Sequence, residues 1–185
     1  MTLTVITPPD ALPVSDAELK SHLRIGHDGE DALVSKLNAS ATKHVEAALG
    51  HVLVERTLER RLRGWPPALS GRGALLLPRP VIALENVRIE SDGLGPEDVT
   101  GRFRLFCDRL VLRPWSIAPS VPLDGAAIIR FRAGYGGAED VPEDLKLAIM
   151  LTAEEAYGSG RDHRGAPELP EHVGRILSNH RGLQL

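Results

Sequence analysis

The chain has 185 residues, of which 42% are hydrophobic and 25% charged, and its formal net charge is −3 with a pI near 6.2. This length suits one ordinary core and is short for two, so we expect a single domain, 1–185, with an insertion. The slightly acidic charge excludes a general attraction to nucleic acid, and no stretch of about 18 apolar residues could span a bilayer. Cys107 is the single cysteine, which excludes an internal disulfide. Without a signal-like N-terminus, we expect a reducing cytoplasm.

The N-terminal residues predict an extended arm followed by a short capped helix. Residues 1–13 contain three prolines and alternate apolar with polar side chains, which favours extended chain over helix. Ser15 and Glu18 then form an S-x-x-E capping box, with apolar residues placed on either side as a hydrophobic staple. We therefore predict a helix over residues 15–24.

The longest segment with a single clear period covers residues 28–49. Its apolar residues recur every four positions and form one stripe of a helix of about six turns. Asp28 can cap the first free amides of this helix, and Gly50 can end it at the C-terminus. Small alanine side chains beside the stripe allow a neighbouring backbone to approach closely, from the same chain or from another copy. The stripe consists of Leu33, Leu37, Ala41, Val45 and Leu49.

After Gly50 the hydrophobic period changes from 3.6 to 2, which predicts an antiparallel β-rich insertion over residues 52–133. The charged residues of its first strand suggest that one face of the sheet meets water or a polar partner. Residues 91–101 are rich in turn formers and predict a loop, and the three prolines of residues 114–125 predict a connector. The predicted strands are 52–62, 74–77, 81–90, 103–106, 110–112 and 126–133.

The C-terminal part predicts two further helices. Pro142 is a favoured first helical residue and acidic residues follow it, so we expect a helix over residues 142–157. Apolar side chains surround this helix, which predicts burial on several sides. Residues 158–167 resemble a flexible polar linker, and 169–181 predict a last short helix. The fold class is therefore α+β, with a helical core of the short, long and C-terminal helices and an inserted antiparallel β-sheet.

The order of these parts resembles the phage head-tail connector, or head-completion adaptor, family. The matching stretches are VSDAELKSHLRI followed by DGEDALVSKLNASATKHVEAALG, then LPRPVIALENVRI, then AAIIRFRAGYGGAEDVPEDLKLAIMLTAEEAYGSGR. No single motif is diagnostic, but the order and the spacing of the parts are unusual. Residues 65–73 and 94–122 match nothing in the family, and such loops can carry partner specificity.

The resemblance implies a structural protein without turnover or cofactor, in the neck of a virion or phage-like particle assembled in the bacterial cytoplasm. Copies of the chain would form a ring, expected to be dodecameric. The ring would join the portal protein to the next tail-neck component, a stopper or tail terminator. DNA would only pass through, without sequence-specific contact, and no membrane is implied. Tailed phages, prophages and gene transfer agents all contain such proteins, and the sequence does not choose among them.

Three sets of residues are candidates for contacts in such a ring. A thin aliphatic core should not cover both the long helix and residues 142–157 in one copy, which predicts a subunit interface at Leu33, Leu37, Ala41, Val45, Ala148, Ile149 and Leu151. The segment 166–185 either folds back onto its own domain or docks on the portal, as the resemblance implies, through Leu169, Val173, Ile176 and Leu177. Basic residues of the first strand either line a DNA channel or, as interleaved glutamates favour, are merely solvated: Arg56, Arg60, Arg61 and Arg63.

Other chemistry finds little support in the sequence. The seven histidines lack the H-x-x-x-H or H-E-x-x-H spacing of metal sites, so we expect no metal. The glycines at 134–137 lack the Gly-Lys-Ser/Thr of a phosphate loop, and Cys107 has no histidine neighbour. The alternative function is a small DNA-binding or regulatory protein of a prophage region, although no helix-turn-helix signal is present.

Overall fold

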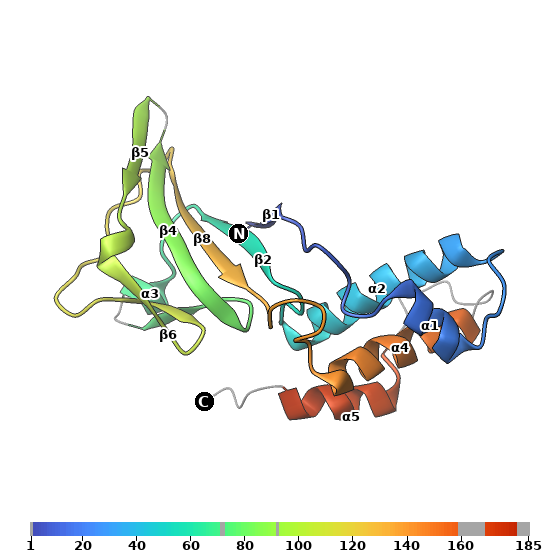
Figure 1. Cartoon of the computed structure of the whole chain (residues 1–185). Coiled ribbons are helices and arrows are strands. Elements are labelled where there is room, and N and C mark those ends of the chain that lie inside the picture. The colour runs from blue at the N-terminus through green and yellow to red at the C-terminus, as the bar shows by residue number, and fades with distance from the viewer. Residues whose placement is uncertain (1, 71–72, 92, 159–168, 181–185) are drawn as a thin grey trace. The chain divides into compact units, whose positions relative to one another are not determined.

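The computed structural model describes residues 2–70, 73–91, 93–158 and 169–180 (Figure 1). The chain divides into two compact units. The first, which we call the sheet unit, contains Met1–Pro9 and Glu55–Gly134. The second, the helical unit, contains Asp10–Val54 and Tyr135–Leu185. Helices and antiparallel strands are both present, which confirms the predicted α+β class.

The sheet unit consists of two antiparallel sheets. The larger has the strand order β1-β2-β8-β4-β5, and the smaller has the order β3-β7-β6. Two short helices, α3 (Pro67–Ser70) and the 3-10 helix η1 (Thr100–Arg102), lie between strands in the chain. The strands are β1 (Thr2–Thr7), β2 (Arg56–Leu62), β3 (Ala74–Leu76), β4 (Val81–Ser91), β5 (Leu94–Asp98), β6 (Phe103–Phe106), β7 (Arg109–Leu112) and β8 (Ala126–Ala133).

The core of the sheet unit follows the alternation of β2 and β8. Leu58 lies opposite Phe131, and Leu62 lies opposite Ala127, and all four side chains are buried. Because successive residues of a strand point to opposite faces, Glu59 and Arg61 of β2 and Arg130 of β8 lie on the other face of this sheet. Further strands add to the core Leu75, Leu77, Val87, Ile89, Phe103 and Leu110.

Two predictions about strands are corrected by the structure, and one gains detail. The arm predicted over residues 1–13 is extended at Thr2–Thr7, where it forms β1 and pairs with β2. Residues 52–54 are not part of β2, and their apolar side chains are buried in the helical unit instead. The predicted loop 91–101 contains β5, which pairs with β4. Main-chain pairing alone defines this strand, because its acidic side chains show no apolar alternation from which a strand could be predicted.

The helical unit contains α1 (Asp16–Leu23), α2 (Asp31–Leu49), α4 (Glu143–Gly158) and α5 (Glu171–His180). The capping box is confirmed: the Ser15 hydroxyl accepts from the Glu18 amide at 3.2 Å, and the Glu18 carboxylate accepts from the Ser15 amide at 2.8 Å. Gly50 ends α2 in the left-handed conformation, at φ 66°. Asp28, in contrast, does not cap α2, because its carboxylate accepts from Lys20 Nζ at 3.0 Å instead.

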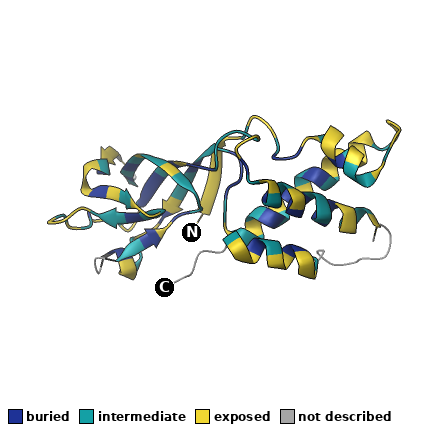
Figure 2. Cartoon of the chain, turned by 60° about the horizontal axis from the view of Figure 1, so that its bottom comes forward, coloured by how far each residue is buried: buried dark blue, intermediate teal, exposed yellow. Residues whose placement is uncertain are grey.

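The four helices enclose one apolar core (Figure 2). Figure 2 shows the buried residues in dark blue on the inward sides of the helices. The core residues come from every helix and from the segments that precede them: Val14, Leu19, Val34, Ala41, Val45, Leu53, Val54, Val141, Leu145, Ala148, Ile149, Ala153, Val173 and Leu177. Within the described residues, no helix has both the length and the apolar surface that spanning a bilayer requires.

The capping box gives a prediction about stability and pH. Ser15→Ala is expected to lower the free energy of unfolding by about 1 kcal/mol at pH 7, because the variant leaves a helical amide without its acceptor. Hydrogen bonds from the Ser15 amide and hydroxyl hold the pKa of Glu18 below its ordinary value. The stabilisation that the Glu18 carboxylate contributes is therefore complete above the pKa that Glu18 has in the unfolded chain. It is lost as the pH falls through the lower pKa that Glu18 has in the folded chain.

Urea unfolding of wild type and Ser15→Ala between pH 7 and pH 3 measures this effect. The difference between the two proteins should shrink below the ordinary pKa of 4.5 for Glu18. Ser21→Ala is the matched control, because Ser21 is an exposed residue of the same helix. A difference that stays constant with pH would contradict the assigned role of the Glu18 carboxylate.

Candidate interaction surfaces

The residues predicted as a subunit interface lie at different depths of the helical unit. Ala41, Val45, Ala148 and Ile149 are buried, with at most 3% of their surface exposed. The reasoning that one copy could not cover both apolar faces is therefore wrong, because α1, α2, α4 and α5 of the same chain enclose them. Leu37 and Leu151 are partly buried against this core. Leu33 is 46% exposed and stays available to a neighbouring copy.

The described part of the C-terminal segment packs on its own unit. Val173 and Leu177 are fully buried, and Leu169 and Ile176 are partly buried against the same core. At the end of α5, His180 Nε2 lies 2.6 Å from a carboxylate oxygen of α4, Asp144 Oδ2. The anchors predicted for portal docking thus hold α5 on the helical unit, and only its opposite side faces solvent. Residues 159–167 of the predicted linker, together with residues 168 and 181–185, lie outside the described residues.

The basic residues predicted to line a DNA channel do not share one face. Arg56 and Arg60 lie on the same face of β2 as the buried Leu58, and Arg60 Nη1 donates to the Leu76 carbonyl at 2.6 Å. Burial lowers the pKa of Arg60. Arg61 lies on the opposite face, 3.3 Å from Glu90, and the exposed Arg63 follows the end of the strand.

The outer face of the five-stranded sheet carries a ladder of ion pairs, which we call the ion-pair face. Glu59 Oε2 accepts from Arg130 at 2.9 Å and lies 3.4 Å from Arg88. Arg132 donates to Glu55 at 2.7 Å. Arginines and glutamates balance across this face, so it has little net charge to attract DNA. Its members are Arg61, Arg88, Arg130, Arg132, Glu55, Glu59, Glu85 and Glu90.

Glu59 is the centre of this ladder, which gives a second prediction. Glu59→Gln is expected to lower the free energy of unfolding by about 1–3 kcal/mol, because two partly buried arginines lose their charged acceptor. Chemical unfolding at neutral pH measures the effect. Glu85→Gln is the matched control on the same face, since Glu85 lies 4.0 Å from its arginine and should lose little. Equal effects of the two substitutions would contradict the central role of Glu59.

Sequence reasoning missed a group of exposed apolar side chains in the connector 113–125. Trp115 is 97% exposed, Ile117 is 80% exposed, and Leu123 is fully exposed. The middle of the loop is nonetheless fixed, because Trp65 Nε1 donates to the Pro119 carbonyl at 2.7 Å. The only signal in the sequence was the combination of large apolar residues with three prolines in a stretch that matches nothing in the connector family.

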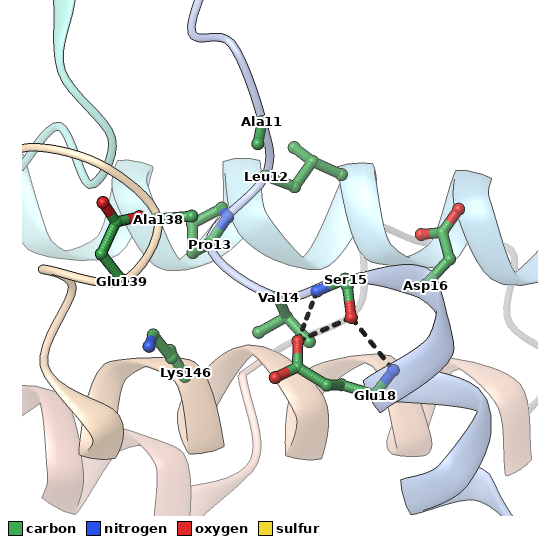
Figure 3. Close-up of a pocket in the computed structure, with 10 residues that line it drawn as sticks. All are labelled: Ala11, Leu12, Pro13, Val14, Ser15, Asp16, Glu18, Ala138, Glu139 and Lys146. Atoms are coloured by element: carbon green, nitrogen blue, oxygen red, sulfur yellow. Dashed lines mark hydrogen bonds between the residues drawn. The ribbon is translucent and has the colours of Figure 1, made fainter.

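An open hollow of about 530 Å³ lies in the helical unit at the start of α1 (Figure 3). Ser15 and Glu18 in its wall bond to one another, and Lys146 pairs with Glu143 at 2.7 Å. The polar groups of the hollow therefore serve the helix ends and do not form a set for chemistry. In the parts of the chain that the structure describes, no group of three His, Cys, Asp or Glu residues could hold a metal ion.

The whole chain resembles solved structures of particle necks. A chain in the neck of an empty gene transfer agent (GTA) particle, computed with C6 symmetry, has 26% identity and a TM-score of 0.80. A chain in the virion of a native gene transfer agent particle has 26% identity and a TM-score of 0.78. A chain in the neck of a native GTA particle, computed with C12 symmetry, has 28% identity and a TM-score of 0.76. Each match covers 100% of this chain and 97% of the other.

No protein-family model and no curated protein matches the sequence. The solved structures nevertheless match from end to end, across both units, at 26–28% identity. The matches include residues 65–73 and 94–122, for which the sequence alone suggested no relative. Over its full length the chain is therefore similar to chains in the necks of gene transfer agent particles, which supports a structural neck role of the kind that the resemblance to head-tail connectors implied.

Proposed function

We propose that the chain is a structural adaptor in the neck of a phage-like particle, where copies of it form a ring between the portal protein and the next tail-neck component. The observation that carries this proposal is the full-length match to chains of gene transfer agent necks. Two of those necks were computed with C6 and C12 symmetry, which supports a ring built from identical copies. A dodecamer is the ring size that we propose.

The role in this proposal is mechanical, without substrate, cofactor or turnover. Buried interfaces between copies and with neighbouring components do the work, and such contacts need area and complementarity instead of reactive groups. In the helical unit, a neighbouring copy can still contact Leu33, which is exposed. The portal can still contact the solvent side of α5, which carries Glu171, His172, Arg175, Ser178 and Asn179.

Deletion of the gene tests the adaptor function. Particles made without the chain should accumulate as filled or emptied heads that lack tails, because the portal then offers no surface to the tail. Electron microscopy of the particles measures the fraction of heads with tails, and the wild-type gene supplied in trans should restore it. Tails attached at the normal level in the absence of the chain would refute the adaptor function.

The alternative of a DNA-binding regulator predicts a different result. Its candidate arginines lie on different faces of β2, and the ion-pair face has balanced charges. We therefore expect the purified chain not to retard short duplex DNA at moderate salt, where nonspecific phosphate contacts are screened. Clear retardation at that salt would favour the alternative over the adaptor.

A further inference from the structure

Two patches of the sheet unit expose large apolar side chains. The Trp115 loop presents Trp115, Ile117 and Leu123. The β1 patch presents Leu3, Val5 and Ile6, each between 42% and 49% exposed. β1, Thr2–Thr7, contains no charged residue, and the Trp115 loop has charged residues only near its two ends, Arg113 and Asp124. Large exposed apolar side chains gathered in one segment mark interaction sites more often than those scattered singly.

The Trp115 loop is held in place before any partner binds. Its prolines fix the backbone, and the Trp65 indole anchors it through the Pro119 carbonyl. The Trp65 ring also packs on Phe103, with ring centroids 5.0 Å apart. Trp115 itself adopts a positive φ of 66°, which is uncommon for a bulky residue. The backbone of the loop is therefore already ordered in the free chain, which lowers the entropy that a partner has to offset.

The β1 patch is an edge strand with an uncovered apolar side. β1 pairs only with β2 in its sheet, so about half of its backbone donors and acceptors point outward. Val5 lies opposite Leu58, which is buried. β1 thus extends the apolar face of the sheet. The apolar side chains of β1 are exposed, because the core of the sheet unit does not extend beneath this strand. An uncharged edge strand left in this state invites association with another chain.

A ring of identical copies needs two different patches on each copy. The contact in a cyclic ring with more than two members is heterologous, so one surface of each copy meets a different surface of the next copy. The two patches come from different parts of the sheet unit, because β1 is the edge strand next to β2, whereas the Trp115 loop joins β7 of the smaller sheet to β8 (Figure 1). The charges of the ion-pair face are paired with one another in salt bridges. Among the exposed apolar side chains of the sheet unit, those of the Trp115 loop are the most exposed, and those of the β1 patch lie on an edge strand.

We propose that the Trp115 loop of one copy packs on the β1 patch of the next copy around the ring. This inference rests on the ring in the proposed function, and it adds the surface through which the ring closes. In this contact the apolar side chains of the loop pack on the apolar side chains of the β1 patch, and the contact buries no charged side chain. A contact of the Trp115 loop with itself would instead be isologous and would stop at a dimer.

Disulfide trapping tests the pairing directly. In a Cys107→Ser background, which removes the exposed native thiol, Val5→Cys and Ile117→Cys are introduced together, so that Trp115 is kept, and particles are assembled with this chain. Oxidised necks should release a ladder of covalent oligomers on a non-reducing gel. The chains with either cysteine alone should give no ladder. Tailed particles that form without a ladder from the double variant would overturn the pairing while the adaptor function stands.

Substitution of the anchor gives an independent test. Trp115→Ser should reduce the yield of tailed particles at least about tenfold, since tryptophans dominate the energetics of interfaces. Thermal unfolding should be unchanged, because Trp115 is 97% exposed. Phe106→Ser is the matched control, as Phe106 is an exposed aromatic outside both patches. If Trp115→Ser rings assemble normally but fail to take a tail, the loop contacts the next neck component and the proposed pairing is wrong.

Discussion

Ile149→Asp is expected to unfold the helical unit. Ile149 has 0% of its surface exposed and lies in the apolar core, where no cation is placed to pair with a carboxylate. Burying an unpaired carboxylate costs several kcal/mol, which is a large part of the 5–15 kcal/mol that stabilises a typical domain. Far-UV circular dichroism and urea unfolding of the purified variant measure the loss. Ala148→Asp should behave in the same way.

Leu147→Asp is the control for this experiment, because Leu147 is the neighbouring residue of α4 and is 41% exposed. Its carboxylate can stay in water, so the fold should survive with a much smaller loss of stability. A folded, ring-forming Ile149→Asp variant would show that this face of α4 is accessible. The assignment of Ile149 to the core of one chain would then be false.

Leu177→Ala is expected to lower the free energy of unfolding by about 2–5 kcal/mol, because a fully buried leucine leaves a cavity. Leu177 is 0% exposed in the core of the helical unit. Adding Val173→Ala should increase the loss, since both residues hold α5 on the same core. Arg175→Ala is the control on the exposed side of α5 and should change stability by less than about 1 kcal/mol.

This prediction also separates the two roles considered for the C-terminal segment. If Leu177 docks on the portal and not on its own unit, Leu177→Ala should leave unfolding unchanged and abolish the joining of tails to heads. If it packs on its own unit, stability should fall first, and the yield of tailed particles should fall only as far as folding does. Urea unfolding and particle counts on the same variant decide between these results.

The helices could be predicted because their signals are local. The four-residue repeat of α2, the Ser15 capping box and the Gly50 stop each act within a few residues, and the structure contains all three. The edge strands β1 and β5 could not be predicted in this way. An edge strand is defined by main-chain pairing with another strand, and neither the residues of β1 nor residues 95–98 of β5 are buried, so no core contact marks them in the sequence.

The candidate surfaces were predictable only in part. Periodicity identifies which residues of α2 and α4 are apolar, but whether the same chain or another copy covers them depends on tertiary packing. Ala41 and Ile149 are covered by their own chain, whereas Leu33 is not. The ion-pair face shows a similar limit, because the alternation puts Glu59 and Arg130 on polar faces and only the strand register places them opposite one another.

The division of the chain also has a consequence for biosynthesis. The helical unit takes Asp10–Val54 and Tyr135–Leu185, and most of the sheet unit is encoded between them. On the ribosome, α1 and α2 therefore emerge long before α4 and α5, and β8 is complete before α4 appears. Because domains tend to fold as they emerge, the strands of the sheet can pair before α4 and α5 have been synthesised. At that stage Val34 and Val45 of α2 are not yet covered by these two helices. Until α4 and α5 emerge, the apolar sides of α1 and α2 lack the residues that complete their core.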